Sequence, residues 1–567
     1  MPVREIEKPL AWLLAVGTVF ITCFVWTGSG TDPVNAPKML ALGAMSFGVL
    51  GIILKFGIKT LWTDSRLFLT LNLAFISLSV SSTIFSNSPF TQNLYGAYGR
   101  NTGLLTYFSL AIISLGATLV RSQESFLKFS RAIIVAGVLN VIYCLWVLIF
   151  GDPIPWNNTY KNILGLLGNP NFISAFLGIV ASAGLAYSLK PRSKIKSRIL
   201  YVSLLLACVF LIFESHSIQG IFVTLAGSAA VVFFFLRDKF KSVFLHFGYL
   251  ILVATGGIFA ISGMLQHGPL SFIYKKSVSL RGAYWDAGIE MGQSHPFTGV
   301  GLDSYGDWYR SARPPVALVD TPGPTVLSNA SHNVAIDLFA SGGFPLLIVY
   351  LGMIILGIKS ILNLVRIHKK YDLITVVLVS TWLGYHAQSI VSINQIGLAV
   401  WGWAVTGLLI AYEKVSKREN VAKELSPSQS FSRKKKTGPQ VVSPQLVIGL
   451  GLVVGSIISV PPMSSDARWF VATQTSDLNS FKSALVDDYL HPINSPRLAN
   501  AAVILQNSNL LSEAREYALM GIKFNPDYFE SYLVLYGLPN SSESEKKFAM
   551  DNMKRLDPNN PNVLNYK

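Results

Sequence analysis

The sequence predicts an all-α protein, a polytopic bundle of about 13 transmembrane helices with a long outward loop and a small outward helical-repeat domain. Hydrophobic residues make up 51% of its 567 residues, and charged residues make up only 13%. A soluble protein carries about 25% charged residues, so this chain lacks the polar surface that water requires. The composition excludes a soluble enzyme, a disordered chain and a nucleic-acid-binding domain, and it indicates a protein of the lipid bilayer.

Apolar runs of about 20 residues, the length of helix that crosses a ~30 Å hydrocarbon core, recur along the chain. We expect spans at 10–27, 36–56, 67–85, 103–120, 132–150, 171–189, 199–213, 218–236, 243–264, 344–365, 373–392, 396–412 and 445–461. The first run follows Arg4 and Lys8 as a signal peptide would, but further spans follow it. We therefore expect an uncleaved first helix.

Basic residues mark the loops on one side of the membrane. They follow spans two, four, six, eight, ten and twelve, as Lys55 follows the second span and Arg121 the fourth. Because cytoplasmic loops collect Lys and Arg, the N-terminus and these loops are expected in the cytoplasm. The same asymmetry explains the net charge of +16, so no nucleic-acid partner is expected.

The alternation of loops divides the chain into four parts. Residues 1–412 are expected to form the membrane core, with a long outward loop at 265–343. A basic cytoplasmic linker at 413–444 leads to the last transmembrane helix at 445–461. The remainder, 462–567, is then extracytoplasmic.

Residues 462–567 are polar and show helical spacing of their apolar side chains. Two helical units end at Asn525-Pro526 and Asp557-Pro558, and the two prolines lie 32 residues apart, close to the tetratricopeptide period. We expect a tetratricopeptide-like helical domain, with an ordinary helical hairpin as the alternative. Such a domain would dock a protein or glycan partner, or pack on the large outward loop.

No metal or cofactor site is predicted. The eight histidines form no pair at i, i+4 and no cluster with cysteine. The sequence contains neither a phosphate-binding Gly-Lys loop nor a Gly-x-Ser-x-Gly motif. The three cysteines lie in apolar runs, so no disulfide framework is expected.

Three cations lie near the expected outer interface. Arg100 precedes span four, Arg281 lies in the long loop, and His332 shortly precedes span ten. Alone, an arginine there could reach lipid headgroups and a histidine could be structural. Together, two guanidiniums can hold a diphosphate, and a histidine can take a proton from a hydroxyl. Diphosphate lipid carriers place their phosphates at this interface, so the set would fit glycan transfer from such a carrier.

Further substrate-binding candidates lie nearby. Asn169 and Asn171 stand where span six begins, and capping of that helix is the alternative to glycan contact. Trp285 could stack on a sugar, or pack in the core of the loop. His216 and Gln219 stand where span eight begins, and Asn333 follows His332 as an orienting or capping group.

Four segments carry a resemblance to a known family. They are Gly99-Arg100-Asn101-Thr102-Gly103-Leu104-Leu105, Gly168-Asn169-Pro170-Asn171-Phe172, Arg281-Gly282-Ala283-Tyr284-Trp285 with His295-Pro296-Phe297-Thr298-Gly299-Val300-Gly301-Leu302, and Ser331-His332-Asn333-Val334-Ala335-Ile336-Asp337-Leu338-Phe339-Ala340-Ser341-Gly342-Gly343-Phe344. In this order they resemble segments of the O-antigen ligase superfamily, over about 90–412. Some members of that superfamily carry tetratricopeptide tails.

The resemblance implies a metal-independent bacterial membrane glycosyltransferase of the C-class type, without a cofactor. Such enzymes take a glycan from undecaprenyl diphosphate on the outer face of the cytoplasmic membrane, and the acceptor is a lipid, a glycan or a protein. His332 would be the base or the acceptor-positioning residue, and Arg100 and Arg281 would hold the leaving diphosphate. Many members carry an arginine where this sequence has His216 or Gln219.

Two other functions fit the spans. A multispan transporter or lipid-linked glycan flippase would place its site near the midplane of the membrane, whereas the charged residues here cluster at the outer ends of the spans. A non-catalytic scaffold that presents the C-terminal repeats would leave Arg281 and His332 without a role.

Overall fold

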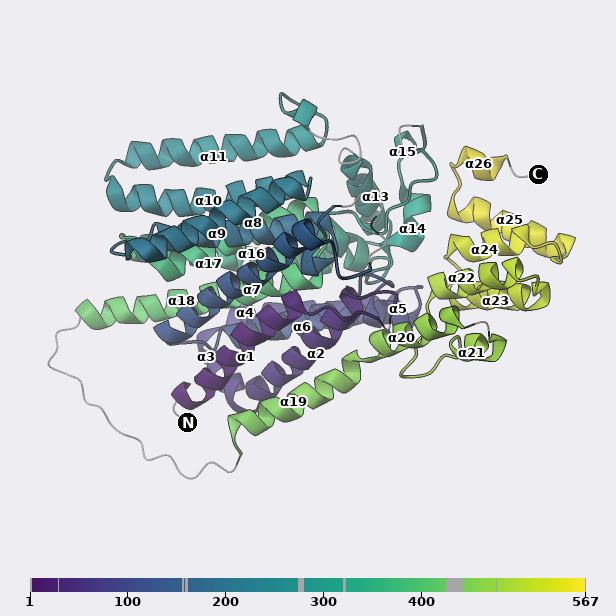
Figure 1. The fold of residues 1–567 in the computed structure, drawn as a ribbon, viewed down its shortest axis with the longest axis horizontal. Helices are drawn as coiled ribbons and strands as arrows, with labels where there is room; N and C mark the ends of the chain where they lie inside the picture. The colour runs from purple at the N-terminus through teal and green to yellow at the C-terminus, as the bar shows by residue number, and fades with distance from the viewer. Residues whose placement is uncertain are drawn as a thin grey trace.

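The protein is helical throughout the part of the chain that the computed structural model describes, residues 3–28, 30–155, 158, 162–273, 280–319, 323–424, 442–475 and 477–565. No β-strand forms within these ranges. Long, roughly parallel helices make up a bundle, and a set of short helices lies beyond one end of it (Figure 1). The fold is therefore the predicted all-α, multi-pass membrane bundle.

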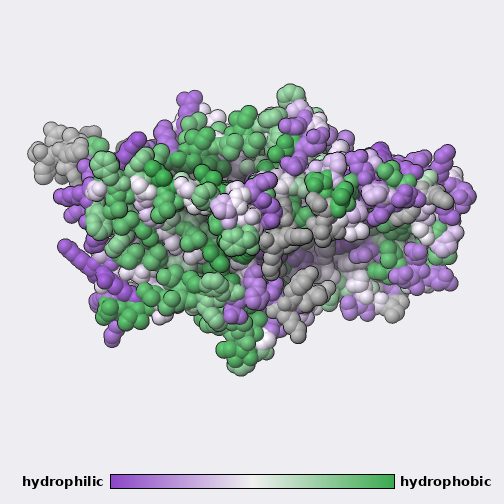
Figure 2. Space-filling model, turned by 90° about the horizontal axis from the view of Figure 1, so that it is seen from above, coloured by the Kyte–Doolittle hydropathy of each residue, from purple (hydrophilic) through white to green (hydrophobic). Residues whose placement is uncertain are grey.

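The bundle contains fourteen α-helices in the described ranges. They are α1 (Val3–Cys23), α2 (Asn35–Ile52), α3 (Ile58–Asp64), α4 (Arg66–Phe85), α6 (Leu104–Ala117), α7 (Gln123–Phe150), α8 (Pro170–Ser188), α9 (Ile195–Glu214), α10 (Ile218–Lys239), α11 (Val243–Met264), α16 (Val334–Ile367), α17 (Leu373–Val391), α18 (Ile396–Glu424) and α19 (Pro444–Ser459). A π-helical turn, Ile53–Gly57, joins α2 to α3. Figure 2 shows apolar side chains over the bundle and polar ones at its end and over the C-terminal part.

Each predicted span coincides with a helix, but fewer of these helices are long enough to cross a membrane than predicted. Eleven described helices have the length and hydropathy of a span, and the bent pair α19 and α20 (Pro461–Gln474) raises the number to 12. The difference is α6, which has only 14 residues. A helix of that length spans about 21 Å. Nearly all its side chains are buried, so protein rather than lipid surrounds it.

Helix α16 begins ten residues before the predicted span, because Asn333 caps it. The Asn333 Oδ1 accepts hydrogen bonds from the backbone N–H groups of Ala335 (3.0 Å) and Ile336 (3.3 Å). The helix then breaks at Gly343, where φ is 67° and ψ is −166°. A Cβ at Gly343 would lie 2.3 Å from the carbonyl oxygen of Pro296, so a larger residue does not fit. The outer turns of α16 are thus a separate segment, fixed against the preceding loop.

Among its described residues, the predicted outward loop has three short α-helices before α16, and they lie at one end of the bundle. They are α13 (Arg281–Ser294), α14 (Tyr305–Ala312) and α15 (Val316–Val319), and they lie between the bundle and the C-terminal domain (Figure 1). Tyr284, Met291, Tyr305 and Tyr309 form a small apolar core here, separate from that of the bundle. The loop is therefore a packed subdomain that can hold side chains in fixed positions.

The C-terminal domain consists of short helices with an apolar core of their own. After α20 they are α21 (Leu478–Ser483), α22 (Ser495–Asn507), α23 (Leu511–Phe524), α24 (Phe529–Gly537), α25 (Glu543–Leu556) and α26 (Pro561–Leu564). Helices α22 and α23 form one hairpin and α24 and α25 a second, and the hairpins begin 34 residues apart. The tetratricopeptide-like character of the domain stays a prediction. The predicted linker is helical to Glu424, and its basic run at 433–436 lies outside the described residues.

Buried ion pairs join the C-terminal domain to the outward loop. Arg313 donates to both carboxylate oxygens of Asp557 at 2.7 Å, and these two side chains are 1% and 0% exposed. Arg310 reaches Glu530 at 2.7 Å and Asp557 at 3.2 Å. The loop and the domain therefore lie at the same end of the bundle, as four intervening crossings (α16 to α19) require. The C-terminal domain therefore packs on the large outward loop, which is one of the alternatives expected for it.

Replacing Asp557 by Ala is expected to destabilise the C-terminal domain by about 3–5 kcal/mol, because it leaves the guanidinium of Arg313 buried without its partner. The exposed Asp551 on α25, the helix that ends just before Asp557, is the matched control, and Asp551→Ala should change little. Thermal unfolding of the purified proteins measures the difference. Equal midpoints for Asp557→Ala and the wild-type protein would contradict this role of the ion pair.

Candidate functional site

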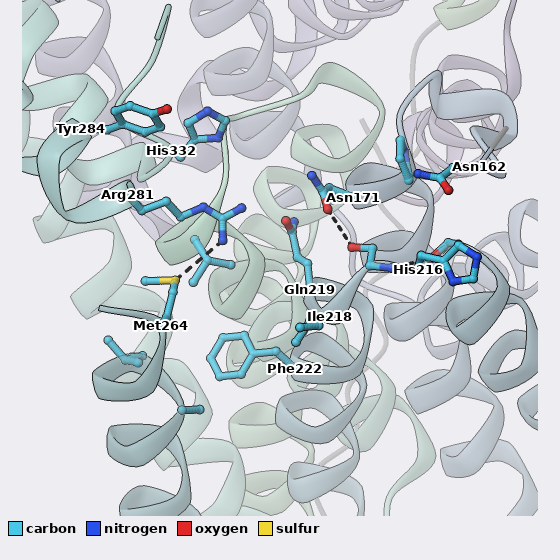
Figure 3. A pocket seen from close by; sticks show the side chains of 16 residues that line it. Asn162, Asn171, His216, Ile218, Gln219, Phe222, Met264, Arg281, Tyr284 and His332 are labelled. Carbon is cyan, nitrogen blue, oxygen red and sulfur yellow. Dashed lines mark hydrogen bonds between the residues drawn. The ribbon is translucent and has the colours of Figure 1, made fainter. Parts of the chain in front are cut away.

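A cavity of about 560 Å³ lies where the outward loop meets the ends of α8, α10 and α11. Side chains from these helices, from α13 and from the turn before α16 point into it (Figure 3). The residues that matter for its chemistry are Asn171, His216, Gln219, Arg281, Tyr284 and His332. The structure thus brings five of the predicted site residues to one cavity, although they are up to 161 residues apart in the sequence.

His332 is held in a strained backbone conformation. Its φ is 58°, in the left-handed region that few residues other than glycine adopt. Such a conformation costs about 1–3 kcal/mol and persists only where neighbouring groups fix it. Here the Ser331 N–H donates to Asp337 Oδ1 at 2.7 Å, and the Ser331 hydroxyl donates to the Asn333 carbonyl at 2.9 Å. The turn therefore fixes the position of the imidazole.

The imidazole of His332 is kept neutral. Its ring packs against that of Tyr284 with 5.7 Å between the ring centroids. Burial first, and then the charges of Arg281 and Arg100, lower the pKa of His332 to about 3. No residue in the described ranges forms a hydrogen bond with the ring. At neutral pH the imidazole can therefore accept a proton.

Arg281 supplies a permanent positive charge inside the cavity. It is the first residue of α13, and its guanidinium points toward Gln219 and Asn171 on the opposite wall (Figure 3). Its Nη1 lies 3.7 Å from the sulfur of Met264, the last residue of α11. A guanidinium presents planar pairs of N–H donors that fit phosphate oxygens. The arrangement suits an anion held between α10, α11 and α13.

Arg100 lies outside the lining of this cavity. It is buried, its Nε is 3.3 Å from Asp303 Oδ1, and its Nη1 donates to the carbonyl of Asn329. The other oxygen of Asp303 accepts hydrogen bonds from the N–H groups of Ala97 (2.8 Å) and Thr102 (3.1 Å). Arg100 therefore joins the loop before α6 to the turn that carries His332. It acts on the cavity through its charge and not through direct contact.

Gln219 differs from Arg100, because its side chain is buried but its polar atoms are available to a ligand. It is 6% exposed, and neither its Oε1 nor its Nε2 has a hydrogen-bond partner in the described part of the chain. It lies in the first turn of α10, after His216, whose φ of 55° also places it in the left-handed region. A buried amide with unused donors and acceptors is costly unless a ligand satisfies it. Gln219 therefore fits substrate binding.

The remaining predicted residues have structural contacts. The Asn169 Oδ1 accepts a hydrogen bond from the N–H of Asn171 at 2.8 Å, so it caps α8, the alternative foreseen for it. Asn171 lines the cavity, and its Oδ1 accepts a hydrogen bond from the Ser217 hydroxyl at 2.7 Å. Trp285 lies beside Tyr284 on α13 but does not line the cavity. Asn333 caps α16, as foreseen.

The sequence analysis missed two residues of this region. Tyr284 packs on His332, and its carbonyl accepts a hydrogen bond from the Tyr305 hydroxyl at 2.6 Å. Asp303 holds Arg100. Tyr284 could have been found from its place in the Arg281 motif, three residues on and therefore on the same face of the helix. Nothing in the sequence singles out Asp303.

A comparison with family models identifies the region that carries the site. Residues 202–351 match the family model described as O-antigen ligase. This range contains His216, Gln219, Arg281, Tyr284 and His332, all of which line the cavity. The match confirms the family predicted from the motifs. No curated protein matches the chain significantly.

Proposed function

Since residues 202–351 match the O-antigen ligase family, we propose that this membrane protein takes a glycan from undecaprenyl diphosphate and transfers it to an acceptor hydroxyl. The reaction would take place at the outer face of the bacterial cytoplasmic membrane. The observation that carries the proposal is the joint placement of Arg281, Gln219 and a neutral His332 around one cavity.

The position of the cavity supports a lipid-linked donor. One wall of the cavity is apolar and is formed by Phe222 of α10 and by Ala260 and Ile261 of α11. The polar groups of the cavity stand at helix ends, since Gln219 is in the first turn of α10 and Arg281 is the first residue of α13. A carrier lipid could lie along the apolar wall with its diphosphate at the helix ends. A transporter site is expected nearer the midplane of the membrane.

The chemistry follows from the two groups that face the cavity. A ring nitrogen of His332 takes the proton of the acceptor hydroxyl as its oxygen attacks the anomeric carbon of the donor glycan. The bond between that carbon and the diphosphate oxygen breaks, and its electron pair leaves with the diphosphate. Arg281 stabilises the negative charge on the leaving group. The negative diphosphate also favours the imidazolium, which makes His332 a stronger base once the donor is bound.

Arg100 has a positioning role in this proposal. Its contacts with Asp303 and with the carbonyl of Asn329 hold the turn before His332. Its charge adds to that of Arg281 in keeping the imidazole neutral before the donor binds.

The pH dependence of the reaction tests the coupling between Arg281 and His332. Burial is the main cause of the low pKa of His332, and the guanidinium of Arg281 lowers it further, so replacing Arg281 by Gln should raise that pKa above about 3. The acid limb of the pH profile of kcat/KM should then move to higher pH. Arg281→Lys keeps the charge and is the control, with an unchanged acid limb. An acid limb at the same pH in all three proteins would contradict the coupling.

The direct test uses the purified full-length protein in lipid nanodiscs with an undecaprenyl-diphosphate-linked glycan. Mass spectrometry should detect free undecaprenyl diphosphate and a glycosylated acceptor in equal amounts. Unchanged donor, under conditions in which the donor binds, would reject the proposal.

A further inference from the structure

A second cavity, of about 410 Å³, lies between the outward loop and the C-terminal domain. Its walls come from the segment before α6, from α14, from the turn before α16, and from the first residues of the hairpins α22–α23 and α24–α25. It shares two lining residues with the first cavity, Tyr284 and His332. The imidazole of His332 therefore stands between the two cavities.

The two cavities differ in charge. The first holds the guanidinium of Arg281 and no carboxylate among its described lining residues. The second is lined by Asp303, Asp307 and Glu530 and by one guanidinium, Arg310. Asp303 is paired with Arg100 at 3.3 Å and Glu530 with Arg310 at 2.7 Å, so both of these cations are already engaged by carboxylates. A diphosphate is attracted to Arg281 in the first cavity, whereas the cations near the second are already paired with carboxylates. The second cavity thus suits a neutral or cationic molecule.

Asp307 has an oxygen that remains available to a ligand. The side-chain amides of Gln92 (2.8 Å) and Asn525 (3.0 Å) both donate to its Oδ2, so its Oδ1 is left for the cavity that the residue lines. Burial raises the pKa of Asp307 to about 7. A carboxyl group in this state can accept a hydrogen bond from a hydroxyl or donate one to it.

Aromatic rings complete the second cavity. Tyr528 and Phe529 of the C-terminal domain and Tyr98 and Tyr284 of the core line it beside the carboxylates. Hydroxyl groups of a sugar bond to carboxylates and amides, and the apolar faces of its ring pack on aromatic side chains. A lipid chain would leave the open oxygen of Asp307 without a partner, and an anionic acceptor would meet cations that are already paired. The composition points to a saccharide without phosphate groups.

We infer that the second cavity binds the acceptor, that this acceptor is a neutral or cationic saccharide, and that the C-terminal domain supplies part of its binding site. The inference rests on the proposed function and names its acceptor class. The donor would bind through the first cavity, the acceptor hydroxyl would reach His332 from the second, and the imidazole would take its proton at the junction. The domain is then a part of the acceptor site.

Tyr528 gives the sharpest test. Its hydroxyl forms no hydrogen bond with any described residue, so a substitution there breaks none. Tyr528→Phe keeps the ring and Tyr528→Ala removes it. The probe is the neutral trisaccharide chitotriose, with binding to the full-length protein in nanodiscs measured by saturation-transfer NMR in the absence of donor. We expect binding to wild type and Tyr528→Phe, and binding weakened about three- to tenfold in Tyr528→Ala.

A second variant narrows the cavity without removing a polar group. Leu327 lines it and is 42% exposed, so Leu327→Trp should fill part of the space and weaken the binding of chitotriose. Val319→Trp, at an 86% exposed position outside the cavity lining, is the matched control and should bind as wild type does. Equal binding to the wild-type protein, Tyr528→Ala and Leu327→Trp would overturn the inference.

The choice of acceptor in the transfer reaction separates the inference from the proposed function. Wild type is offered chitotriose, an unstructured peptide rich in Ser and Thr, and a phosphorylated lipid-linked saccharide, each with the lipid-diphosphate donor. Transfer to chitotriose supports the inference, and transfer to the peptide or the phosphorylated acceptor alone overturns it while the proposed function stands. Failure to release undecaprenyl diphosphate with any acceptor would instead reject the proposed function.

Discussion

Replacing His332 by Ala is expected to lower glycan transfer by about 10²–10⁴-fold, the usual contribution of a general base. The acceptor hydroxyl is a poor nucleophile near neutral pH, and no other base lies among the described residues that line the first cavity apart from His216, which stands on the opposite wall (Figure 3). Binding of the donor should persist, because Arg281 and Gln219 remain.

His332→Asn is the variant that separates catalysis from folding. The backbone at this position has a φ of 58°, which asparagine tolerates better than alanine does. Both variants should lose transfer, and His332→Asn should keep the thermal stability of the wild-type protein. The exposed His267, in the same outward loop, provides the control substitution His267→Ala. Near-normal transfer by His332→Asn would remove His332 from the role of base and leave the stabilisation of the leaving group as the source of catalysis.

Replacing Arg281 by Lys is expected to raise the KM for the lipid-diphosphate donor by about 10–100-fold, although the charge is kept. Arg presents a planar fork of N–H donors that matches two phosphate oxygens, whereas Lys is a single charged point on a flexible stem. The protein level and the KM for the acceptor should stay the same. The comparison is made on purified protein, with Arg192→Lys at an exposed position as the control. An unchanged KM for the donor would exclude Arg281 from diphosphate binding.

The membrane core could be predicted because its physical signal is local. Each predicted span coincides with a helix, since about 20 apolar residues in a row have few alternatives to a helix in lipid. The beginning of α16 was missed because its first ten residues are separated from the apolar run by the break at Gly343, which packs against Pro296, 47 residues away in the sequence. The length of α6 was overestimated because an apolar helix enclosed by protein has the composition of one that faces lipid.

The candidate site could be predicted where its residues occur in sequence motifs. It could not be predicted where tertiary contacts determine whether a side chain reaches the cavity. Arg281, His332 and Gln219 reach one cavity as the motifs suggested. Arg100 does not, because Asp303, which no motif marks, takes its guanidinium. The second cavity could not be predicted at all, since it brings together Tyr98, Asp307 and Tyr528 from three distant segments.

The measurement that tests the central claim most directly is the release of undecaprenyl diphosphate by the purified full-length protein and by His332→Asn, with the lipid-diphosphate-linked glycan and a saccharide acceptor. The account predicts release and matching transfer by wild type, and rates lower by about 10²–10⁴-fold in the variant, with donor binding intact in both. Equal rates for the two proteins, or no release by wild type that binds the donor, would contradict it.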